Sequence, residues 1–221
     1  MPTSKQSIPK VKASMTRREQ SSEANRANII DVATRIFAEH GLAGARMDLI
    51  AKEMHTTKPM IYYYFGNKED LYIAVLEEAY RRIRNIEATL HLDELDPESA
   101  LRKLVDFTVR YQYQHPEFVR LVLTENINRG AYLAKSKVIH KLNTPAIDAV
   151  EQIYKRGLKE KIFRPGIDPI DLHMTISGLS VFNVSNKHTF SYIFKRDLDS
   201  KGAFDIRCAN IVELILRYVK N

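Results

Sequence analysis

Apolar residues recur at helical spacing along the chain from about residue 25 almost to its end. In the segment 25–40 one helical face is apolar, and Gly41 follows as a stop signal. The residues of that face are Ile29, Ala33, Ile36 and Phe37. No segment alternates apolar and polar residues over the length of a strand. The pattern therefore predicts an all-α protein without a sheet.

Residues 46–71 predict two short helices separated by a tight polar turn. The first helix has an apolar stripe at positions i, i+3, i+4 and i+7, namely Met47, Ile50, Ala51 and Met54. Thr57 is expected to cap the second helix through its hydroxyl, and Pro59 suits a first turn. Ile61 and Phe65 then recur at i and i+4. Two short helices around such a turn have the dimensions of a helix-turn-helix, whose second helix enters a DNA major groove.

Start signals containing proline divide the rest of the chain into further helices, because a cap residue and a proline favour a first turn. These signals are Asp96-Pro97-Glu98, His115-Pro116-Glu117, Thr144-Pro145 and Asp168-Pro169. The last of them opens a helix from Ile170 to about Asn186. A long helix from Glu69 to about His91 precedes the signals, and a final helix runs from about Ala203 to Lys220.

The spacing of residues 25–76 resembles the DNA-binding domain of the TetR family of bacterial transcriptional regulators. The matching residues are Ile30, Ala33, Phe37, Gly41, Ile50, Ala51, Thr57, Lys58, Tyr62, Tyr64, Phe65, Lys68, Glu69 and Leu71. The resemblance implies an N-terminal three-helix helix-turn-helix domain followed by a larger helical ligand-binding and dimerisation domain. We accordingly divide the chain into a basic, disordered tail at 1–24, a DNA-binding domain at 25–68 and an effector-binding and dimerisation domain at 69–221.

The sequence departs from the family pattern at three points. His55 stands in the turn where the family usually has glycine, which predicts either a different turn geometry or a positive φ at His55. Ala45-Arg46 replaces the hydroxyl residue that usually caps the first helix of the pair. Pro59 replaces a small residue after Lys58, and we expect it to change base contacts without abolishing the fold.

The aromatic run Tyr62-Tyr63-Tyr64-Phe65 covers the whole circumference of a helix. Because Phe65 shares the inner face with Ile61, Tyr62 and Tyr63 are expected to point outward, with Tyr64 at the margin. By resemblance, Tyr62 and Tyr64 contact phosphates and Tyr63 meets bases. A tyrosine suits both tasks, because its ring packs on sugar and its hydroxyl reaches a phosphate oxygen.

The predicted recognition helix presents its N-terminal end to the groove. There Lys58 can donate to guanine O6 and N7, while Pro59 or Met60 can touch thymine methyl groups. No carboxylate stands at the adjacent helical spacings from Lys58, which predicts an ammonium without an internal ion pair. The alternative for Lys58 and Lys68 is ordinary solvated charge. The candidate DNA contacts are Arg46, Thr56, Thr57, Lys58, Pro59, Met60, Tyr62, Tyr63, Tyr64 and Lys68, of which Arg46 is expected to reach a phosphate and Lys68 resembles the family's phosphate lysine.

Charge is unevenly distributed along the 221 residues, whose formal net charge is +7. Residues 1–18 contain five basic residues and no acid, namely Lys5, Lys10, Lys12, Arg17 and Arg18. This tail is either a solvated leader or a basic arm that adds phosphate or minor-groove contacts. Since the remainder is close to neutral, charge alone does not identify a DNA-binding protein.

The sequence lacks the catalytic and metal-binding motifs that would indicate an enzyme. The seven histidines include no pair at i and i+4, and neither a Gly-rich phosphate loop nor a G-x-S-x-G motif occurs. We therefore expect no enzyme, no metal and no cofactor. The lone Cys208 lies in an apolar helical run, where it is either a small core residue or a redox sensor. No signal peptide and no apolar run of about 18 residues is present, so a cytoplasmic protein outside the membrane is expected.

The last two long helices are apolar on more than one side, which predicts a second partner such as another subunit. The alternative is that they form the core of a monomer. The predicted dimer interface consists of Leu172, Ile176, Leu179, Val212 and Leu216. Polar or aromatic residues that interrupt apolar stripes are candidates for an effector pocket or, alternatively, are satisfied buried groups. They are Arg110, Tyr111, Asn126, His173 and Asn183.

Together these features predict a homodimeric, sequence-specific regulator of transcription that a small molecule releases from a palindromic operator in double-stranded DNA. A repressor is favoured over an activator. The alternative is a non-specific DNA-coating or architectural protein that uses the basic tail. A third possibility is a small-molecule sensor that acts through a protein partner.

Overall fold

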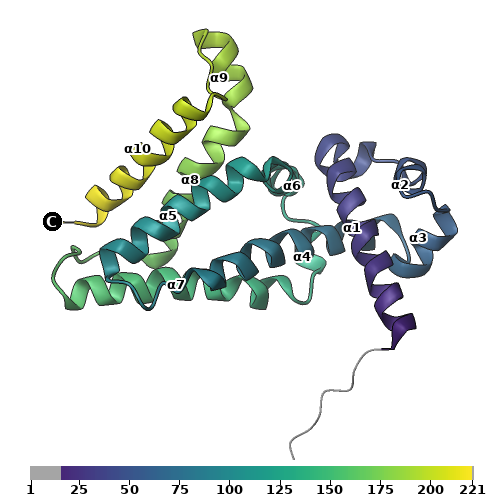
Figure 1. The fold of residues 1–221 in the computed structure, drawn as a ribbon, viewed down its shortest axis with the longest axis horizontal. Helices are drawn as coiled ribbons and strands as arrows, with labels where there is room; N and C mark the ends of the chain where they lie inside the picture. Colours follow the sequence, from purple (N-terminus) through teal and green to yellow (C-terminus); the bar gives the residue numbers. More distant parts are fainter. Residues whose placement is uncertain (1–15, 221) are drawn as a thin grey trace, which may run out of the picture.

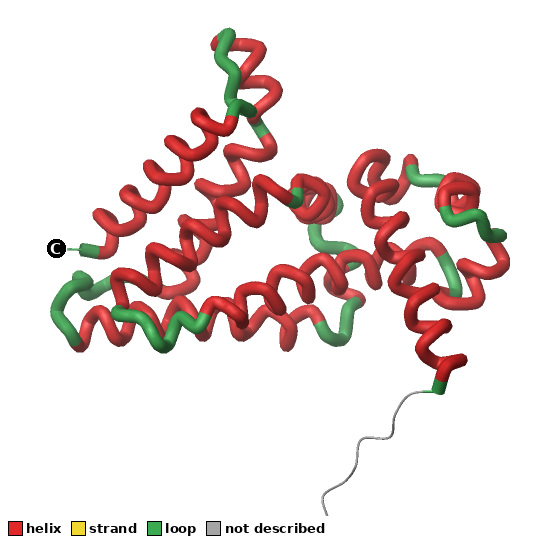
Figure 2. Tube along the Cα trace, in the orientation of Figure 1, coloured by secondary structure: helices red, strands yellow, loops and turns green. Residues whose placement is uncertain are grey.

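The computed structural model describes residues 16–220, and the regular elements in that range are ten α-helices and two short 3₁₀ turns (Figure 1). Within this range the only β pairing is an isolated bridge between Phe163 and Lys220, and Figure 2 shows no strand. The predicted all-α class is confirmed. None of the described helices is both long and apolar enough to cross a membrane.

Three helices gather at one end of the molecule and form its smaller unit (Figure 1). They are α1 (Arg17–Gly44), α2 (Met47–Glu53) and α3 (Lys58–Phe65). Gly41 interrupts α1 with φ 65° and ψ 175°, a conformation that glycine adopts without steric cost. The predicted stop at Gly41 is therefore confirmed, although a last helical turn follows it.

The first helix begins earlier than the sequence pattern predicted. A capping box starts it, because the Thr16 hydroxyl accepts from the backbone N–H of Glu19 at 3.3 Å and the Glu19 carboxylate accepts from the backbone N–H of Thr16 at 2.8 Å. Residues 17–24, which we assigned to the disordered tail, are thus helical. Lys5, Lys10 and Lys12 of that tail lie outside the described residues.

The larger unit contains the remaining elements, which follow the predicted start signals at Asp96, His115 and Asp168. The Asp96 carboxylate accepts from Ser99 N at 2.9 Å, and the Asp168 carboxylate accepts from Ile170 N at 2.8 Å. The elements are α4 (Lys68–Glu87), η1 (Ala88–Leu90), α5 (Pro97–Gln114), α6 (Pro116–Ile127), η2 (Leu133–Lys135), α7 (Ile139–Lys159), α8 (Pro169–Ser185), α9 (Lys187–Phe194) and α10 (Lys201–Val219).

Two elements differ from the sequence prediction. Pro145 does not open a helix but lies inside α7, which begins at Ile139. The start is provided by the Ser136 hydroxyl, which accepts from the backbone N–H groups of Val138 at 3.3 Å and Ile139 at 3.1 Å. The second difference is α9, which the sequence reasoning did not predict although Phe190, Ile193 and Phe194 recur at i, i+3 and i+4. None of its eight residues is buried.

Each unit has its own hydrophobic core, and α6 contributes to the smaller core and, through Phe118 and Val119, to a third cluster. The smaller core gathers around Phe37, Ile50 and Ile61, and Leu121 of α6 inserts into it. The larger core lies between α5, α7, α8 and α10 and contains Cys208, which is 1% exposed. Packing in the core is thus confirmed as the role of Cys208, and burial raises the pKa of its thiol to about 12.

The predicted dimer-interface residues face the chain's own core, which corrects that assignment. Four of them are 5% exposed or less and belong to the larger core, and the fifth packs against it as a half-buried side chain. These residues are Leu172, Ile176, Val212 and Leu216, with Leu179 as the fifth. The sequence showed that α8 and α10 are apolar on more than one side, but it could not tell which side the chain itself covers.

Candidate nucleic-acid interface

The turn between α2 and α3 is closed by backbone hydrogen bonds. His55 N donates to Lys52 O at 3.1 Å, and Thr56 N donates to Ala51 O at 2.9 Å. His55 adopts φ 50°, in the left-handed region where the family usually has glycine. The structure therefore confirms the expectation of a positive φ at His55.

Thr57 occupies the cap position of α3 but does not cap it with its side chain. Its backbone is extended, with φ −115° and ψ 152°, and its hydroxyl makes no capping bond. The prediction of a hydroxyl cap was therefore wrong. Pro59 lies in the first turn as predicted, where a missing N–H costs no helical hydrogen bond. Since the side chain of Thr57 is exposed, its hydroxyl is available to a partner.

The outer face of α3 carries exposed apolar and aromatic side chains. Met60 is 48% exposed, Tyr62 39% and Tyr63 80%, whereas Tyr64 is half-buried and meets the Tyr63 ring edge-on at 5.4 Å. Phe65, like Ile61, is buried beneath them. The predicted orientation of the aromatic run is confirmed.

The other candidate contacts surround this face. Three of them are exposed at the start of α2 and α3, and two are half-buried in the turn and at the start of α4. The exposed residues are Arg46, Lys58 and Pro59, and the half-buried ones are Thr56 and Lys68. All ten candidates thus lie in the turn, along α3, or at the starts of α2 and α4.

Asp48 of α2 forms an ion pair with Lys58, which the sequence reasoning missed. Lys58 Nζ lies 2.6 Å from Asp48 Oδ1, and Arg46 Nη2 lies 3.6 Å from Asp48 Oδ2. The hydrogen bond from Lys58 lowers the pKa of the Asp48 carboxyl. The expectation of an unpaired Lys58 considered spacings within its own helix only, and the carboxylate comes from the neighbouring one. Asp48 thus pairs with basic side chains at the starts of both α2 and α3.

The first turns of α1 lie beside this surface and include Arg17 and Arg18, which the sequence analysis counted in the basic tail. Arg17, Arg18 and Asn25 share a shallow groove with Met60 and Tyr63 of α3. Arg26 packs its guanidinium over the Phe65 ring at 5.0 Å, which holds the two helices together. The signal for this extension was present in the sequence, because Thr16 and Glu19 have the spacing of a capping box.

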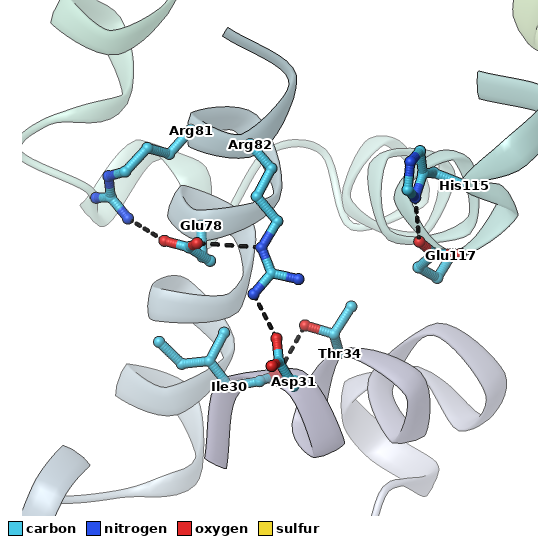
Figure 3. Close-up of polar contacts among 8 residues, drawn as sticks. All are labelled: Ile30, Asp31, Thr34, Glu78, Arg81, Arg82, His115 and Glu117. Atoms are coloured by element: carbon cyan, nitrogen blue, oxygen red, sulfur yellow. Dashed lines mark hydrogen bonds and ion pairs between the residues drawn. The ribbon is translucent and has the colours of Figure 1, made fainter. Parts of the chain in front are cut away.

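A network of polar side chains connects the two units where α1 meets α4 (Figure 3). Arg82 of α4 pairs with Asp31 of α1 and, through Nε at 3.1 Å, with Glu78 one turn earlier. On α1 the Thr34 hydroxyl donates to Ile30 O at 2.7 Å. This ion pair links the DNA-binding unit to the first helix of the larger unit.

The five predicted effector-pocket residues do not share a site. Arg110 is engaged by Asp106 at 2.9 Å and by Asp205 at 3.1 Å, and exposed Asn126 donates to Val122 O at 2.9 Å. The other three line three separate hollows: Tyr111 beside the α1–α4 junction, His173 between α4 and α8, and Asn183 beside α9. The prediction that these five residues form one effector pocket was therefore wrong. Charged residues of α4 also line the hollow at His173. The sequence reasoning missed them, because charged residues on a helix usually face solvent.

Comparison with known proteins identifies the family. The model described as "Bacterial regulatory proteins, tetR family" matches residues 29–75, and the model described as "Tetracyclin repressor-like, C-terminal domain" matches residues 97–215. The chain belongs to the TetR family. Proteins of this family are regulators of transcription that bind DNA through the helix-turn-helix, so the chain is a DNA-binding regulator and not an enzyme.

Curated relatives carry the name of repressors. The HTH-type transcriptional repressor NicS of Pseudomonas putida is 38% identical over 200 residues, which cover 90% of this chain and 94% of NicS. The repressor SCO4008 of Streptomyces coelicolor is 38% identical over 108 residues, or 49% of this chain and 53% of SCO4008. These relatives support a DNA-binding repressor.

Solved structures share the fold over nearly the whole chain. The transcriptional regulator SCO4942 from Streptomyces coelicolor aligns with a TM-score of 0.67 and 25% identity, covering 88% of this chain and 97% of that one. The fatty acid degradation regulator FadR from Bacillus halodurans aligns with a TM-score of 0.68 at 22% identity, covering 86% and 94%. The arrangement of a small N-terminal unit on a larger helical one is therefore common to these regulators.

Proposed function

We propose that the protein is a homodimeric repressor that binds a palindromic operator through α3 and leaves it when a small molecule occupies the larger unit. The exposed face of α3 carries this proposal. Its first turn presents Lys58, Pro59 and Met60 for base edges, and Tyr62 and Lys68 lie where phosphates would flank it. In the same scheme Tyr63 meets bases and Tyr64 a phosphate.

The length of α3 explains why one copy is not enough. Its eight residues span about 12 Å, the length of roughly four base pairs. So short a site cannot be distinguished among the ~10⁶–10⁹ competing sites of a genome. Two copies related by a two-fold axis read two half-sites, and an inverted repeat in the DNA then matches the symmetry of the protein.

The second copy is expected to pack on the outer faces of α8 and α10. These faces are apolar and exposed, opposite the buried stripes that form the chain's own core. On α8 they comprise Ile170 (54% exposed), Met174 (63%) and Phe182 (45%), and on α10 Ile206 (66%), Leu214 (51%) and Tyr218 (40%). Apolar surface of this extent on two neighbouring helices is typical of an interface between subunits.

The response to a ligand is expected to run through α4. This helix starts at Lys68, directly after the recognition helix, and continues into the larger unit (Figure 1). The Asp31–Arg82 ion pair ties it to α1 on the way (Figure 3). A ligand that binds one orientation of α4 better than the other shifts the separation of the two recognition helices and disfavours the operator-bound state.

Selection of binding sites from genomic DNA with the purified protein tests this proposal. We expect an enriched inverted repeat, bound more tightly than random DNA by about 4 kcal/mol or more, the range of specific binders. Binding without an enriched sequence would instead identify a DNA-coating protein.

A further inference from the structure

A cavity of about 280 Å³ lies between α4, α5, α6, α7 and α8 in the larger unit. One part of its wall is apolar and includes Phe118, Val122 and Ile176. The other part is formed by Arg84, Glu87 and Gln112. A protein cavity of about 150 Å³ accommodates a benzene ring, so this one has room for a single-ring compound with substituents.

The polar wall has unused hydrogen-bonding capacity. Gln112 is only 4% exposed, and its Oε1 is buried without a hydrogen-bond partner in the described part of the chain. The same holds for Nε of Arg84. Arg84 Nη1 and Glu87 Oε2 are each other's partner in an ion pair at 2.5 Å. Buried polar groups are normally hydrogen-bonded, so Gln112 Oε1 and Arg84 Nε point to a ligand.

Neighbouring polar groups do not use that capacity. Thr108 donates to Leu104 O at 2.8 Å and Asn143 donates to Ile139 O at 3.0 Å, each within its own helix. His173 also lines the cavity, and burial together with the charge of Arg84 lowers its pKa, so it is neutral at pH 7. The Nε–H donor of Arg84 and the Oε1 acceptor of Gln112 are therefore left for a ligand.

Charge balance decides the class of ligand. Arg84 and Glu87 have side chains 13% and 10% exposed and neutralise each other, so the cavity holds no net charge. An anionic ligand would leave an uncompensated buried charge, which is costly, whereas a neutral ligand would not. We propose that the cavity binds a neutral, planar single-ring compound with a lactam edge. Its carbonyl accepts from Arg84, its ring N–H donates to Gln112, and its faces pack on Phe118 and Ile176.

This inference rests on the proposed function and names the effector class for it. Arg84 and Glu87 belong to the last turn of α4, the helix whose first residue follows α3. A ligand held by Arg84 therefore acts directly on the element that leads to the recognition helix.

Three small probes and the full chain test the ligand class. 2-Pyridone is a neutral lactam, benzoate is an anion of similar size and toluene lacks polar groups. Ligand-observed NMR at millimolar concentrations measures their dissociation constants. We expect 2-pyridone to bind at least about tenfold more tightly than the other two, the worth of one additional hydrogen bond with its partner. Equal binding of toluene, tighter binding of benzoate, or no binding of 2-pyridone would each overturn the proposal.

Two variants separate the polar wall from general effects on folding. Gln112→Leu removes the unpaired acceptor and should weaken 2-pyridone by about tenfold, while Gln114→Leu, on an exposed residue of the same helix, should leave binding unchanged. Glu87→Gln makes the cavity cationic and should make benzoate the preferred probe. If circular dichroism shows that Gln112→Leu does not fold, the preference of Glu87→Gln for benzoate becomes the deciding test. A Glu87→Gln variant that still prefers 2-pyridone would contradict the proposal.

The selected operator distinguishes this inference from the proposed function. If 2-pyridone does not bind while the protein still selects an inverted repeat, the proposed ligand class is wrong and the proposed DNA-binding function is supported. If 2-pyridone binds but leaves operator affinity unchanged, the proposed ligand class is supported and the proposed ligand response is wrong.

Discussion

At the scale of single residues, Lys58 is the side chain with the clearest expected role in sequence recognition. It lies in the first turn of α3, and its ammonium pairs with Asp48 at 2.6 Å. We expect Lys58→Ala to change the preferred operator, with a loss of about 1–3 kcal/mol of discrimination at one position in each half-site. Parallel site selection with the wild type and the variant measures this effect.

The Lys58 experiment needs a control, because removing Lys58 leaves the Asp48 carboxylate unpaired on the DNA-facing surface. That carboxylate would repel phosphates and weaken all sequences alike. The variants Asp48→Ala and Asp48→Ala/Lys58→Ala differ in Lys58 alone and lack this repulsion. Identical selected sequences for these two variants would mean that Lys58 does not contact a base.

Lys68 is expected to contact a phosphate and to be indifferent to sequence. It starts α4, is half-buried and has no ion-pair partner among the described residues. We expect Lys68→Ala to weaken all DNA sequences alike and to lower the slope of log affinity against log salt by about 1 per subunit. Tyr62→Phe should also weaken all sequences alike. Lys159→Ala, an exposed lysine at the end of α7, serves as the control, and a slope for Lys68→Ala equal to that of this control would remove Lys68 from the interface.

At the scale of elements, the break in α1 at Gly41 can be tested with two glycines of the same helix. Gly41 has φ 65°, whereas Gly44 is helical and its added Cβ would only touch His40 Cβ at 3.5 Å. Gly41→Ala should destabilise the protein by about 1–2 kcal/mol, and Gly44→Ala should be neutral or stabilising. Chemical denaturation measures both, and equal stabilities would contradict the assigned break.

Sequence pattern predicted most elements because their signals are local. The caps at Asp96 and Asp168, the stop at Gly41 and the inward face of Ile61 each depend on a few neighbouring residues. The start of α7 was missed because a proline signal outweighed the weaker signal of Ser136.

The sites were harder to predict than the elements, since they depend on contacts between distant segments. The positions of the DNA-contact candidates followed from one helix and the family resemblance. The ion pair of Lys58 with Asp48 joins two helices, and the cavity at Arg84 needs Gln112 and His173 from two more. Apolar periodicity alone cannot tell which of two apolar faces on α8 and α10 the chain buries itself.

At the scale of the whole molecule, the exposed apolar faces of α8 and α10 predict where two chains meet. Met174→Glu with Leu214→Glu should give a monomer that still folds and no longer binds the operator, because carboxylates buried in an interface cost several kcal/mol each. Light scattering and circular dichroism measure both properties. The matched pair Ile176→Glu with Leu216→Glu points into the core and should unfold the chain instead. A dimer that survives the first pair would place the interface elsewhere.

Two chains on one palindrome is the central claim of this account, and the mass of the protein–DNA complex tests it most directly. Native mass spectrometry of the protein with its selected DNA should show two chains per inverted repeat, whose half-sites lie one helical turn or a multiple of it apart. The double variant at Met174 and Leu214 should lose this complex. A single chain per site, or a number of chains that grows with the length of the DNA, would contradict the account.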